Sequence, residues 1–526
     1  LNTLKNCEIR YSGSGAYQYN YTYGAITATN AKVVVDSCVI QQSNTSALGS
    51  FGSASPTFKN LEINNITGVP VSMSMFSNPT FQNISALNIG YMALGIIPET
   101  YSVDATIPIR NYGGYNNITY YLYGTCTINS GTTITIPAGL VFKYGDLTVN
   151  GAIIVNGTSG SPVVFTDDAD DSYGNPADSK GDGASTVPSI QGSQRIYFSD
   201  ISNDVINLVN HAIIRYRDGG ITTLSSSPKI INCTFDKDNW GVYLTGVSNP
   251  IIDTCTFNNL TYAPMRISLV SYPSSTANNV ISGKTFRAIG ILENETLVQD
   301  VTLAKRNFAG ITNIPYLFGN YTIGTGAVLT ISPGVVLKFL YYTGMTIRKG
   351  LIAEGGSTPD STIVFTDYRD DFYGGDTNAD TTASSPYSSY QGWLGIIFQD
   401  EALDPLCRFK NCIFRYAGLS YAYAAVTANN ASPTITYSSI SKNYNGITAT
   451  GSAKPVINYC DIFENSNYSV NNVNKTVNID ARYNWWGNNT GPTHSGKPGG
   501  TGARVPDRVQ YNPFRTIGGQ QPIAGD

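Results

Sequence analysis

Two short stretches of this chain are dense in aspartate, and residues 167–174 of the first align with residues 367–374 of the second. Clustered carboxylates repel one another unless water or a cation neutralises them. Calcium takes about six to eight oxygen ligands, and glycine-rich loops let backbone carbonyls join the carboxylates. The sequence therefore predicts calcium sites in both loops. The candidate ligands are Asp167, Asp168, Asp170, Asp171, Asp178 and Asp182 in the first loop, and Asp367, Asp370, Asp371, Asp376 and Asp380 in the second.

The alternative for both stretches is an acidic loop that projects from the fold and stays solvated. Neither stretch has the ligand spacing of an EF-hand loop. The residue types thus point to calcium, while the spacing does not select a known calcium motif.

Arginine recurs at one slot, as Arg10, Arg215 and Arg415, and each arginine is followed by tyrosine. A polysaccharide lyase would need an unpaired arginine or lysine as its base. Because this arginine is repeated, a structural role is the simpler interpretation. We expect it to pair with a nearby acidic group or a backbone carbonyl.

The two histidines, His211 and His494, suggest no catalytic set. His211 aligns with Cys7 and Cys412, so we expect it to fill a core position. No Gly-x-Ser-x-Gly elbow and no Ser/His/Asp set is apparent. A glycosidase that uses paired carboxylates stays open, because a solenoid assembles its sites from several coils.

Tyrosines alternate in two places, so the tyrosines of one strand would share a face. A tyrosine ring has an apolar face and a polar tip, and an exposed row of such rings can stack on sugars. The alternative is a ladder that serves packing alone. The glycan-stacking candidates are Tyr17, Tyr19, Tyr21, Tyr23, Tyr421 and Tyr423.

The eight cysteines include no two-residue-spaced pair of the metal-binding type. We expect most of them to be small buried residues of the core. The alternative is one or two disulfides between adjacent coils, for example between Cys233 and Cys255, because stacked coils bring like slots within bridging range.

Internal repeats of the sequence predict the strands and turns that position these residues. The segment that ends in Arg-Tyr recurs about every 200 residues, and residues 133–143 recur as residues 329–338. The chain therefore holds about two and a half copies of a unit of roughly 200 residues.

A shorter period of about 22 residues runs inside each unit, as in Ile230–Phe235 and Ile251–Phe257. The repeated bursts alternate apolar and polar residues and are rich in Val, Ile, Thr and Tyr, while helical signals are almost absent. The pattern predicts an all-β right-handed parallel β-helix with coils of about 22 residues. An array of antiparallel sandwich domains would not need a repeated residue at a fixed slot.

We expect four segments along the chain: residues 1–127 as the C-terminal part of a first β-helix repeat, 128–327 and 328–480 as the second and third repeats, and 481–526 as a cap with an irregular tail. Trp485 and Trp486 stand where the regular coils stop, and we expect their rings to cover the apolar end. The chain opens inside a unit, so we expect a fragment or a processed product whose first coil has an open strand edge.

The composition is poor in charge, with 13% Asp, Glu, Lys and Arg, a net charge of −4 and a pI of about 5.3. This balance offers no basic patch, so nucleic acid is not an expected partner. No apolar run approaches the roughly 18–20 residues of a membrane-spanning helix, and no signal peptide is present.

The run from Asp480 to Thr493, centred on Trp485-Trp486-Gly487, resembles the closing segment of secreted bacterial and archaeal right-handed parallel β-helix repeat proteins. Residues 331–339, 365–376 and 511–514 look like that group too. The resemblance implies a secreted or surface-exposed protein, a group that includes adhesin-like proteins and structural fibres. Relatives in the wider fold are pectate-lyase-like enzymes, whose catalytic motifs are not evident here, and fold alone does not carry function.

We therefore expect a non-enzymatic extracellular or cell-surface protein, a stiff β-solenoid segment of an adhesin or of a self-assembling filament. The expected partners are further copies of the chain or other surface proteins, with polysaccharide as a further candidate. The alternative function is a polysaccharide lyase or hydrolase, or a glycan-binding module, on the same scaffold.

Overall fold

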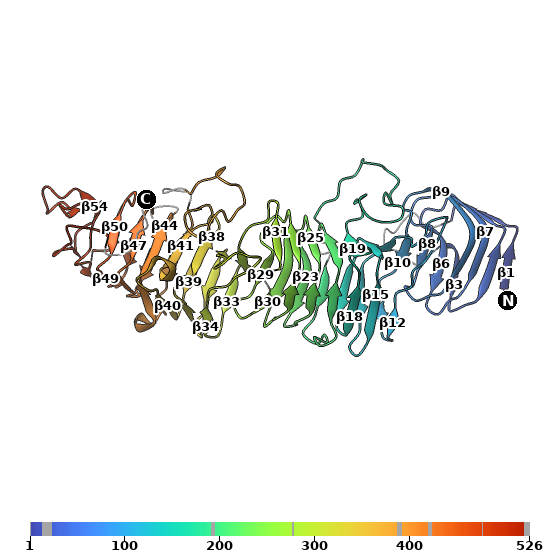
Figure 1. Cartoon of the computed structure of the whole chain (residues 1–526), viewed down its shortest axis with the longest axis horizontal. Helices are drawn as coiled ribbons and strands as arrows, with labels where there is room; N and C mark the ends of the chain where they lie inside the picture. Colours follow the sequence, from blue (N-terminus) through green and yellow to red (C-terminus); the bar gives the residue numbers. More distant parts are fainter. Residues whose placement is uncertain are drawn as a thin grey trace. The chain divides into compact units, whose positions relative to one another are not determined.

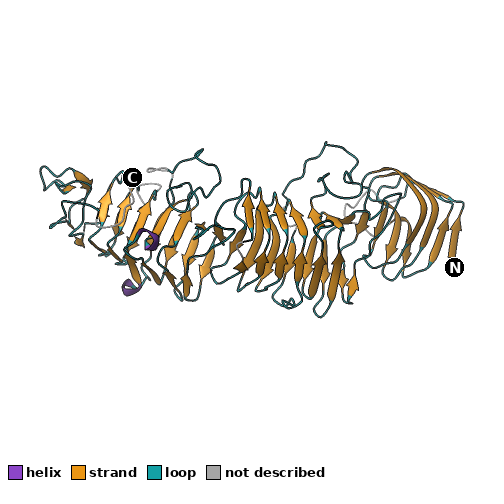
Figure 2. Ribbon diagram, viewed as in Figure 1, coloured by secondary structure: helices purple, strands orange, loops and turns teal. Residues whose placement is uncertain are grey.

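The computed structural model describes residues 2–12, 24–190, 195–275, 278–386, 392–418, 423–475 and 477–519. In this part the chain is an all-β parallel solenoid of about 19 turns, with coils of about 23 residues (Figure 2). The helical elements described are two 3-10 turns, Pro359–Ser361 and Asp404–Leu406. Among the described residues, no helix has the length and apolar character needed to cross a membrane. The predicted parallel solenoid is confirmed, while its handedness stays a prediction.

The chain forms two compact units. Unit 1 comprises Leu1–Thr261 and Ser271–Gly283, and unit 2 comprises Tyr262–Val270 and Lys284–Asp526. The division between them falls inside the second long repeat of the sequence. Each unit contains one acidic loop, so each is described by itself.

In unit 1, one sheet carries β19, the strand from which the first acidic loop leaves, and the strands that pair beside it (Figure 1). It runs from β3 (Gly24–Thr29) to β31 (Val280–Ser282). Its central strands are β13 (Tyr120–Leu122), β16 (Val141–Lys143), β19 (Val163–Thr166), β22 (Ala212–Arg215) and β25 (Thr234–Asp236). Other strands of the unit include β1 (Asn2–Lys5), β2 (Glu8–Arg10), β7 (Thr57–Ile66), β9 (Thr80–Ile89), β20 (Ile196–Phe198) and β26 (Trp240–Thr245).

Unit 2 repeats this arrangement around the second acidic loop. Its corresponding strands are β32 (Ile289–Ile291), β35 (Tyr316–Phe318), β38 (Val336–Phe339), β41 (Ile363–Asp367), β44 (Cys412–Arg415), β47 (Ser439–Ser441) and β50 (Asp461–Phe463). Two further sheets of the unit run from β33 (Glu295–Leu297) to β51 (Val470–Asn472) and from β34 (Val301–Leu303) through β52 (Ile479–Asp480) to β55 (Val509–Gln510). The chain reaches β42 (Gly395–Phe398) after the second loop.

In-register pairing stacks like residues on successive coils. Phe142 of β16 pairs with Phe165 of β19, and their ring centroids are 5.2 Å apart with planes 12° from parallel. In unit 2, Phe365 and Phe414 stack in the same way at 4.8 Å and 6°. Each buried ring removes apolar surface from water, a gain of about 1.5–3 kcal/mol per side chain. The ladders therefore hold neighbouring coils together from inside.

The turn that precedes β22 and β44 corrects one sequence alignment. His211 and Asn411 both have left-handed backbones, with φ of 47° and 49°. Ala212 then pairs with Val163 as Cys412 pairs with Ile363. His211 therefore matches Asn411 at the turn, and the expectation that it fills the core slot of Cys412 was wrong by one residue.

Candidate functional site: two acidic loops held on the solenoid

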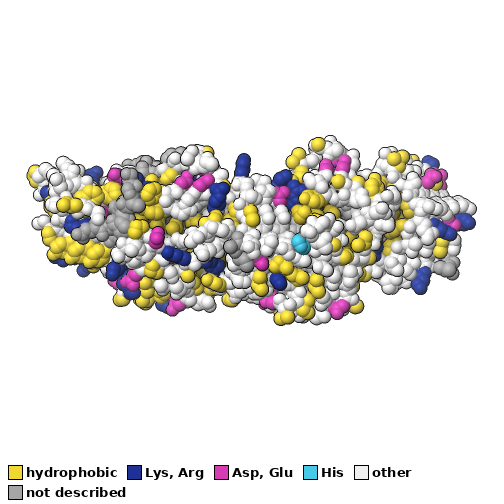
Figure 3. Space-filling view, in the orientation of Figure 1, with side chains coloured by type: hydrophobic (Ala, Val, Ile, Leu, Met, Phe, Trp, Pro, Cys, Tyr) yellow, Lys and Arg dark blue, Asp and Glu magenta, His cyan; other side chains and the backbone are white. Residues whose placement is uncertain are grey.

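Both acidic loops leave the solenoid directly after a buried strand (Figure 1). The first follows β19 and precedes β20, and the second follows β41 and precedes β42. On the face seen in Figure 3, acidic side chains gather over these projecting segments and are scattered elsewhere. Three sets of contacts, repeated in both units, hold each loop in place.

The first set joins an aspartate of the loop to the recurring arginine. Asp170 Oδ2 accepts hydrogen bonds from Thr166 Oγ1 at 2.6 Å and from Arg215 Nη1 at 2.8 Å. In unit 2, Thr366 donates to Asp370 Oδ2 at 2.6 Å, and Arg415 Nε lies 3.7 Å from that oxygen. All of these side chains are buried. The expectation that the repeated arginine pairs with an acidic group is thereby met in both loops.

The arginines are also held between aromatic rings. The guanidinium carbon of Arg215 lies 5.1 Å from the centroid of Tyr173 and 5.0 Å from that of Tyr216. The corresponding distances from Arg415 to Tyr373 and Tyr416 are 5.2 Å and 5.0 Å. In both units, the tyrosine after the arginine and the tyrosine of the loop thus pack against the guanidinium. A cation over a ring face is stabilised by the quadrupole of the ring.

Arg10, at the same slot near the start of the chain, has different surroundings. It pairs with Glu8 on the same strand, and both side chains are about half exposed. In the two units the acidic loop comes before its arginine, since Asp170 precedes Arg215 by 45 residues, and residues 1–9 contain no such loop. The arginine is thus buried at the two slots where a loop aspartate contacts it and half exposed at the slot of Arg10.

The second set of contacts was missed by the sequence reasoning and involves a buried lysine. Lys143 on β16 donates from Nζ to the carbonyl oxygen of Ala177 at 2.7 Å. Lys338 on β38 donates to the carbonyls of Asp370 at 2.9 Å and Gly375 at 2.7 Å. Burial lowers the pKa of Lys143 and lowers that of Lys338 to about 8. The signal was present, because both strands carry a lysine at one slot of an apolar run.

The third set uses the backbone of the coil below each loop. The amide of Met92 donates to the carbonyl of Ser179 at 2.6 Å, and that of Arg287 donates to the carbonyl of Thr377 at 2.7 Å. Ser179 and Thr377 are fully buried. These bonds establish that Met92 and Arg287 occupy equivalent positions in the two units.

Three carboxylates of the first loop meet at one point. Asp171, Asp178 and Asp182 each place an oxygen within 4.8 Å of the oxygens of the other two. Asp178 is oriented by the amides of Gly181 at 2.7 Å and Gly183 at 2.9 Å. Oδ1 of Asp171 and Oδ1 of Asp182 are shielded from solvent and have no hydrogen-bond partner among the described residues. Burial, followed by the charge of Asp178, raises the pKa of Asp171.

The second loop has aspartates at the equivalent positions, Asp371, Asp376 and Asp380, but among the described residues only the three carboxylates of the first loop converge within 4.8 Å. Asp376 accepts hydrogen bonds from the amides of Asp380 and Thr381, both at 3.1 Å. Within the described ranges, Oδ1 of Asp371 and Oδ1 of Asp380 are again shielded and unpartnered. Arg287 Nη1 lies 3.2 Å from Asp376 Oδ2, where unit 1 has the uncharged Met92. A positive charge just before β32 thus lies against Asp376 of the second loop.

The remaining predicted ligands form other contacts. Asp168 pairs with Lys180 at 3.2 Å, and Asp367 pairs with Arg369 at 2.8 Å. Asp167 accepts a hydrogen bond from the amide of Ala169 at 2.9 Å and is buried at the base of the loop. The structure therefore separates the predicted set into a carboxylate cluster and a group of loop anchors.

Most tyrosines of the predicted row are not among the residues that the structure describes. Tyr17, Tyr19, Tyr21, Tyr23 and Tyr421 lie outside the described residues, and Tyr423 is half-buried with its carbonyl bonded to Asn445 Nδ2 at 3.1 Å.

A tyrosine ladder does occur elsewhere in unit 2. Tyr437, Tyr459 and Tyr483 stack at successive centroid distances of 5.2 Å, with planes 7° apart. Because stacking covers the ring faces, this ladder presents mainly ring edges to solvent.

The cysteines and tryptophans lie in the interior or at its end. Cys233 and Cys255 are buried thiols that donate to backbone carbonyls, of Ile231 at 3.2 Å and Asp253 at 3.4 Å respectively. The disulfide between these cysteines is not formed here. Trp486 is fully buried. The backbone of Trp485 forms an isolated parallel β-bridge with Asp461, the first residue of β50.

Comparisons of this chain with protein-family models, with curated proteins and with solved structures find no match. The geometry of the loops, and the solenoid that carries them, are therefore the basis for a function of this chain.

Proposed function

We propose that this chain is a non-enzymatic structural segment of a surface adhesin or a self-assembling filament, located outside the cell. The observation that carries the proposal is the repetition of the loop contacts. The same lysine, arginine, threonine and aspartate contacts hold a projecting loop at the equivalent place in each unit. Repeated lateral features suit a protein that binds copies of itself or other surface proteins.

The state of the basic residues supports this role over catalysis. A lyase base must be free to take a proton from substrate. Arg215 is bonded to Asp170 and Asp236, and Lys143 is buried under its loop. These cations serve as anchors of the loops, which favours the structural function over the lyase alternative.

We further propose that calcium occupies the first loop, with Asp171, Asp178 and Asp182 as ligands. A cation would neutralise the three converging carboxylates and give the two shielded oxygens a partner. Hard oxygen ligands favour Ca²⁺ over softer metals. The second loop should bind calcium more weakly, because Arg287 already supplies a positive charge to Asp376.

Imaging of the purified chain, with and without calcium, tests the structural function. We expect ordered polymers or regular lateral assemblies at physiological salt. A strictly monomeric chain that also fails to bind cell surfaces would contradict it. Incubation with acidic polysaccharides, followed by ultraviolet detection of unsaturated products and a reducing-sugar assay, tests the enzyme alternative, and either activity would overturn the proposal.

A further inference from the structure

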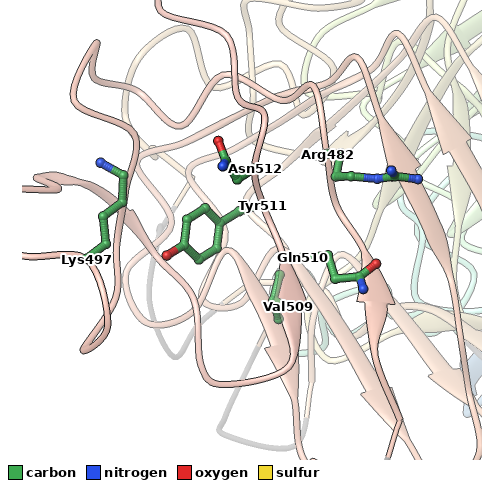
Figure 4. A pocket seen from close by; sticks show the side chains of 6 residues that line it. All are labelled: Arg482, Lys497, Val509, Gln510, Tyr511 and Asn512. Carbon is green, nitrogen blue, oxygen red and sulfur yellow. The ribbon is translucent and has the colours of Figure 1, made fainter.

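The last coils of unit 2 end beside a pocket of about 540 Å³ that neither acidic loop contributes to (Figure 4). Its volume lies in the range of about 300–1,000 Å³ typical of small-molecule sites. The lining is basic and polar, and it consists of Arg482, Lys497, Val509, Gln510, Tyr511 and Asn512.

A short hairpin fixes one wall of this pocket. His494 and Lys497 form an antiparallel bridge, and the amide of Lys497 donates to the carbonyl of His494 at 3.0 Å. The ring of His494 lies 5.4 Å from the ring of Tyr511, centroid to centroid. Tyr511 is thereby held between the hairpin and the end of β55, and Figure 4 shows its ring in the middle of the lining residues.

Lys497 brings a positive charge to this wall. Its ammonium donates to the carbonyl of Thr490 and lies 4.8 Å from the centroid of Phe514. Its contacts in the described part of the chain are thus with a carbonyl and a ring, not with a carboxylate. An ammonium has three N–H donors, so two remain for a ligand.

The opposite wall carries a second cation and two amides. Arg482 donates from Nε and Nη2 to the carboxylate of Asp480, both at 2.9 Å. Three of its five N–H donors remain after these two bonds. Gln510 and Asn512 are exposed, so their side chains can both donate to and accept from hydroxyl groups.

We propose that this pocket binds a carboxylate-bearing saccharide. Lys497 would bind one carboxylate and Arg482, on the other wall, would attract that of a neighbouring sugar unit, Tyr511 would contact the apolar face of a pyranose ring, and the amides of Gln510 and Asn512 would bond the hydroxyls. The inference goes beyond the scaffold function and does not depend on it, since none of these residues belongs to a calcium loop.

Calorimetric titration of the full chain in the presence of a chelator tests this site independently of calcium. The probes are tri-galacturonate, its neutral methyl ester and tri-glutamate. We expect the acid to bind at least roughly tenfold more tightly than the ester, and its affinity to fall as salt rises. Lys497→Met should lower the affinity for the acid about tenfold, because a charge-assisted hydrogen bond is lost.

Lys454→Met is the matched control, because Lys454 is an exposed lysine of the same unit outside the pocket. It should leave the affinity unchanged, and circular dichroism should show that both variants keep the fold. Equal binding of acid and ester, equal effects of the two lysine variants, or binding of tri-glutamate as tight as that of tri-galacturonate would each overturn the proposal.

Discussion

At the scale of single residues, the two loops act as an internal comparison. Both contain shielded carboxylate oxygens without partners among the described residues, but among these residues only the first loop has three converging carboxylates, and Arg287 lies against Asp376 of the second. Met92 and Arg287 stand at the same position relative to their loops. An arginine and a calcium ion would compete to neutralise the same carboxylates, so this difference should contribute to the gap between the two affinities.

Exchange of these residues tests that expectation. Met92→Arg should weaken calcium binding by the first loop about tenfold, equivalent to about 1.4 kcal/mol, because it adds a competing cation. Arg287→Met should strengthen binding by the second loop by a similar factor. Calorimetric titration of the chelator-treated chain measures both. Arg348→Met is the control, since Arg348 pairs with Glu401 away from the loops, and a control with the same effect as either exchange would refute the argument.

The buried lysine of the second loop should make stability depend on pH. Its folded-state pKa is lowered to about 8, below that of an unfolded lysine, so the unfolded chain binds more protons between those values. Stability of unit 2 should therefore rise as pH increases from about 8 to about 10.5, by as much as about 3 kcal/mol. Urea unfolding at several pH values measures this slope. Lys338→Met should flatten it, and an unchanged slope would show that other groups are responsible.

At the scale of elements, the arginine slot shows how burial determines the contribution of an ion pair to stability. Arg215 and Asp170 are both nearly inaccessible to solvent, whereas Arg10 and Glu8 are about half exposed. A buried charge that loses its partner stays desolvated and uncompensated. An exposed pair contributes little, because water and salt screen it.

Truncation at the two slots should reflect this difference. Arg215→Ala should cost about 3–5 kcal/mol of unit 1 stability, because Asp170 is left buried without its cation. Arg10→Ala should cost less than about 1 kcal/mol. Denaturant unfolding followed by tyrosine fluorescence reports both values. Equal losses would mean that the pair with Asp170 contributes no more than a surface contact.

At the scale of the whole molecule, each coil pairs mainly with the coils before and after it, as β19 pairs with β16 and β22. The stability of such a solenoid is approximately a sum of coil terms and nearest-neighbour terms. A substitution that destabilises one coil should therefore affect that coil and its neighbours and leave distant coils unchanged.

Hydrogen exchange monitored by mass spectrometry tests this behaviour. Arg215→Ala should speed exchange in the first acidic loop and in β16 to β25, while β38 to β50 keep their protection. Arg415→Ala should give the reverse pattern. Uniform loss of protection along the chain in either variant would indicate that the molecule opens as one cooperative block.

The sequence by itself determined the parallel solenoid, its period and the existence of two acidic loops. These follow from patterns that are local or repeated, since alternation within a strand and recurrence at a fixed slot need no knowledge of distant contacts. The repetition of Arg215 and Arg415 was likewise enough to predict a structural arginine, whose partner could be an acidic group or a backbone carbonyl.

Only the tertiary structure decided which aspartates face one another and which are anchors. Asp170 and Asp171 are neighbours in sequence, yet one bonds to Arg215 and the other joins the cluster with Asp178 and Asp182. Met92 meets its loop across more than 80 residues of sequence, and the basic pocket joins a hairpin to the end of a coil. Such contacts depend on how irregular loops fold back onto the coils, and a repeat pattern does not describe irregular backbone.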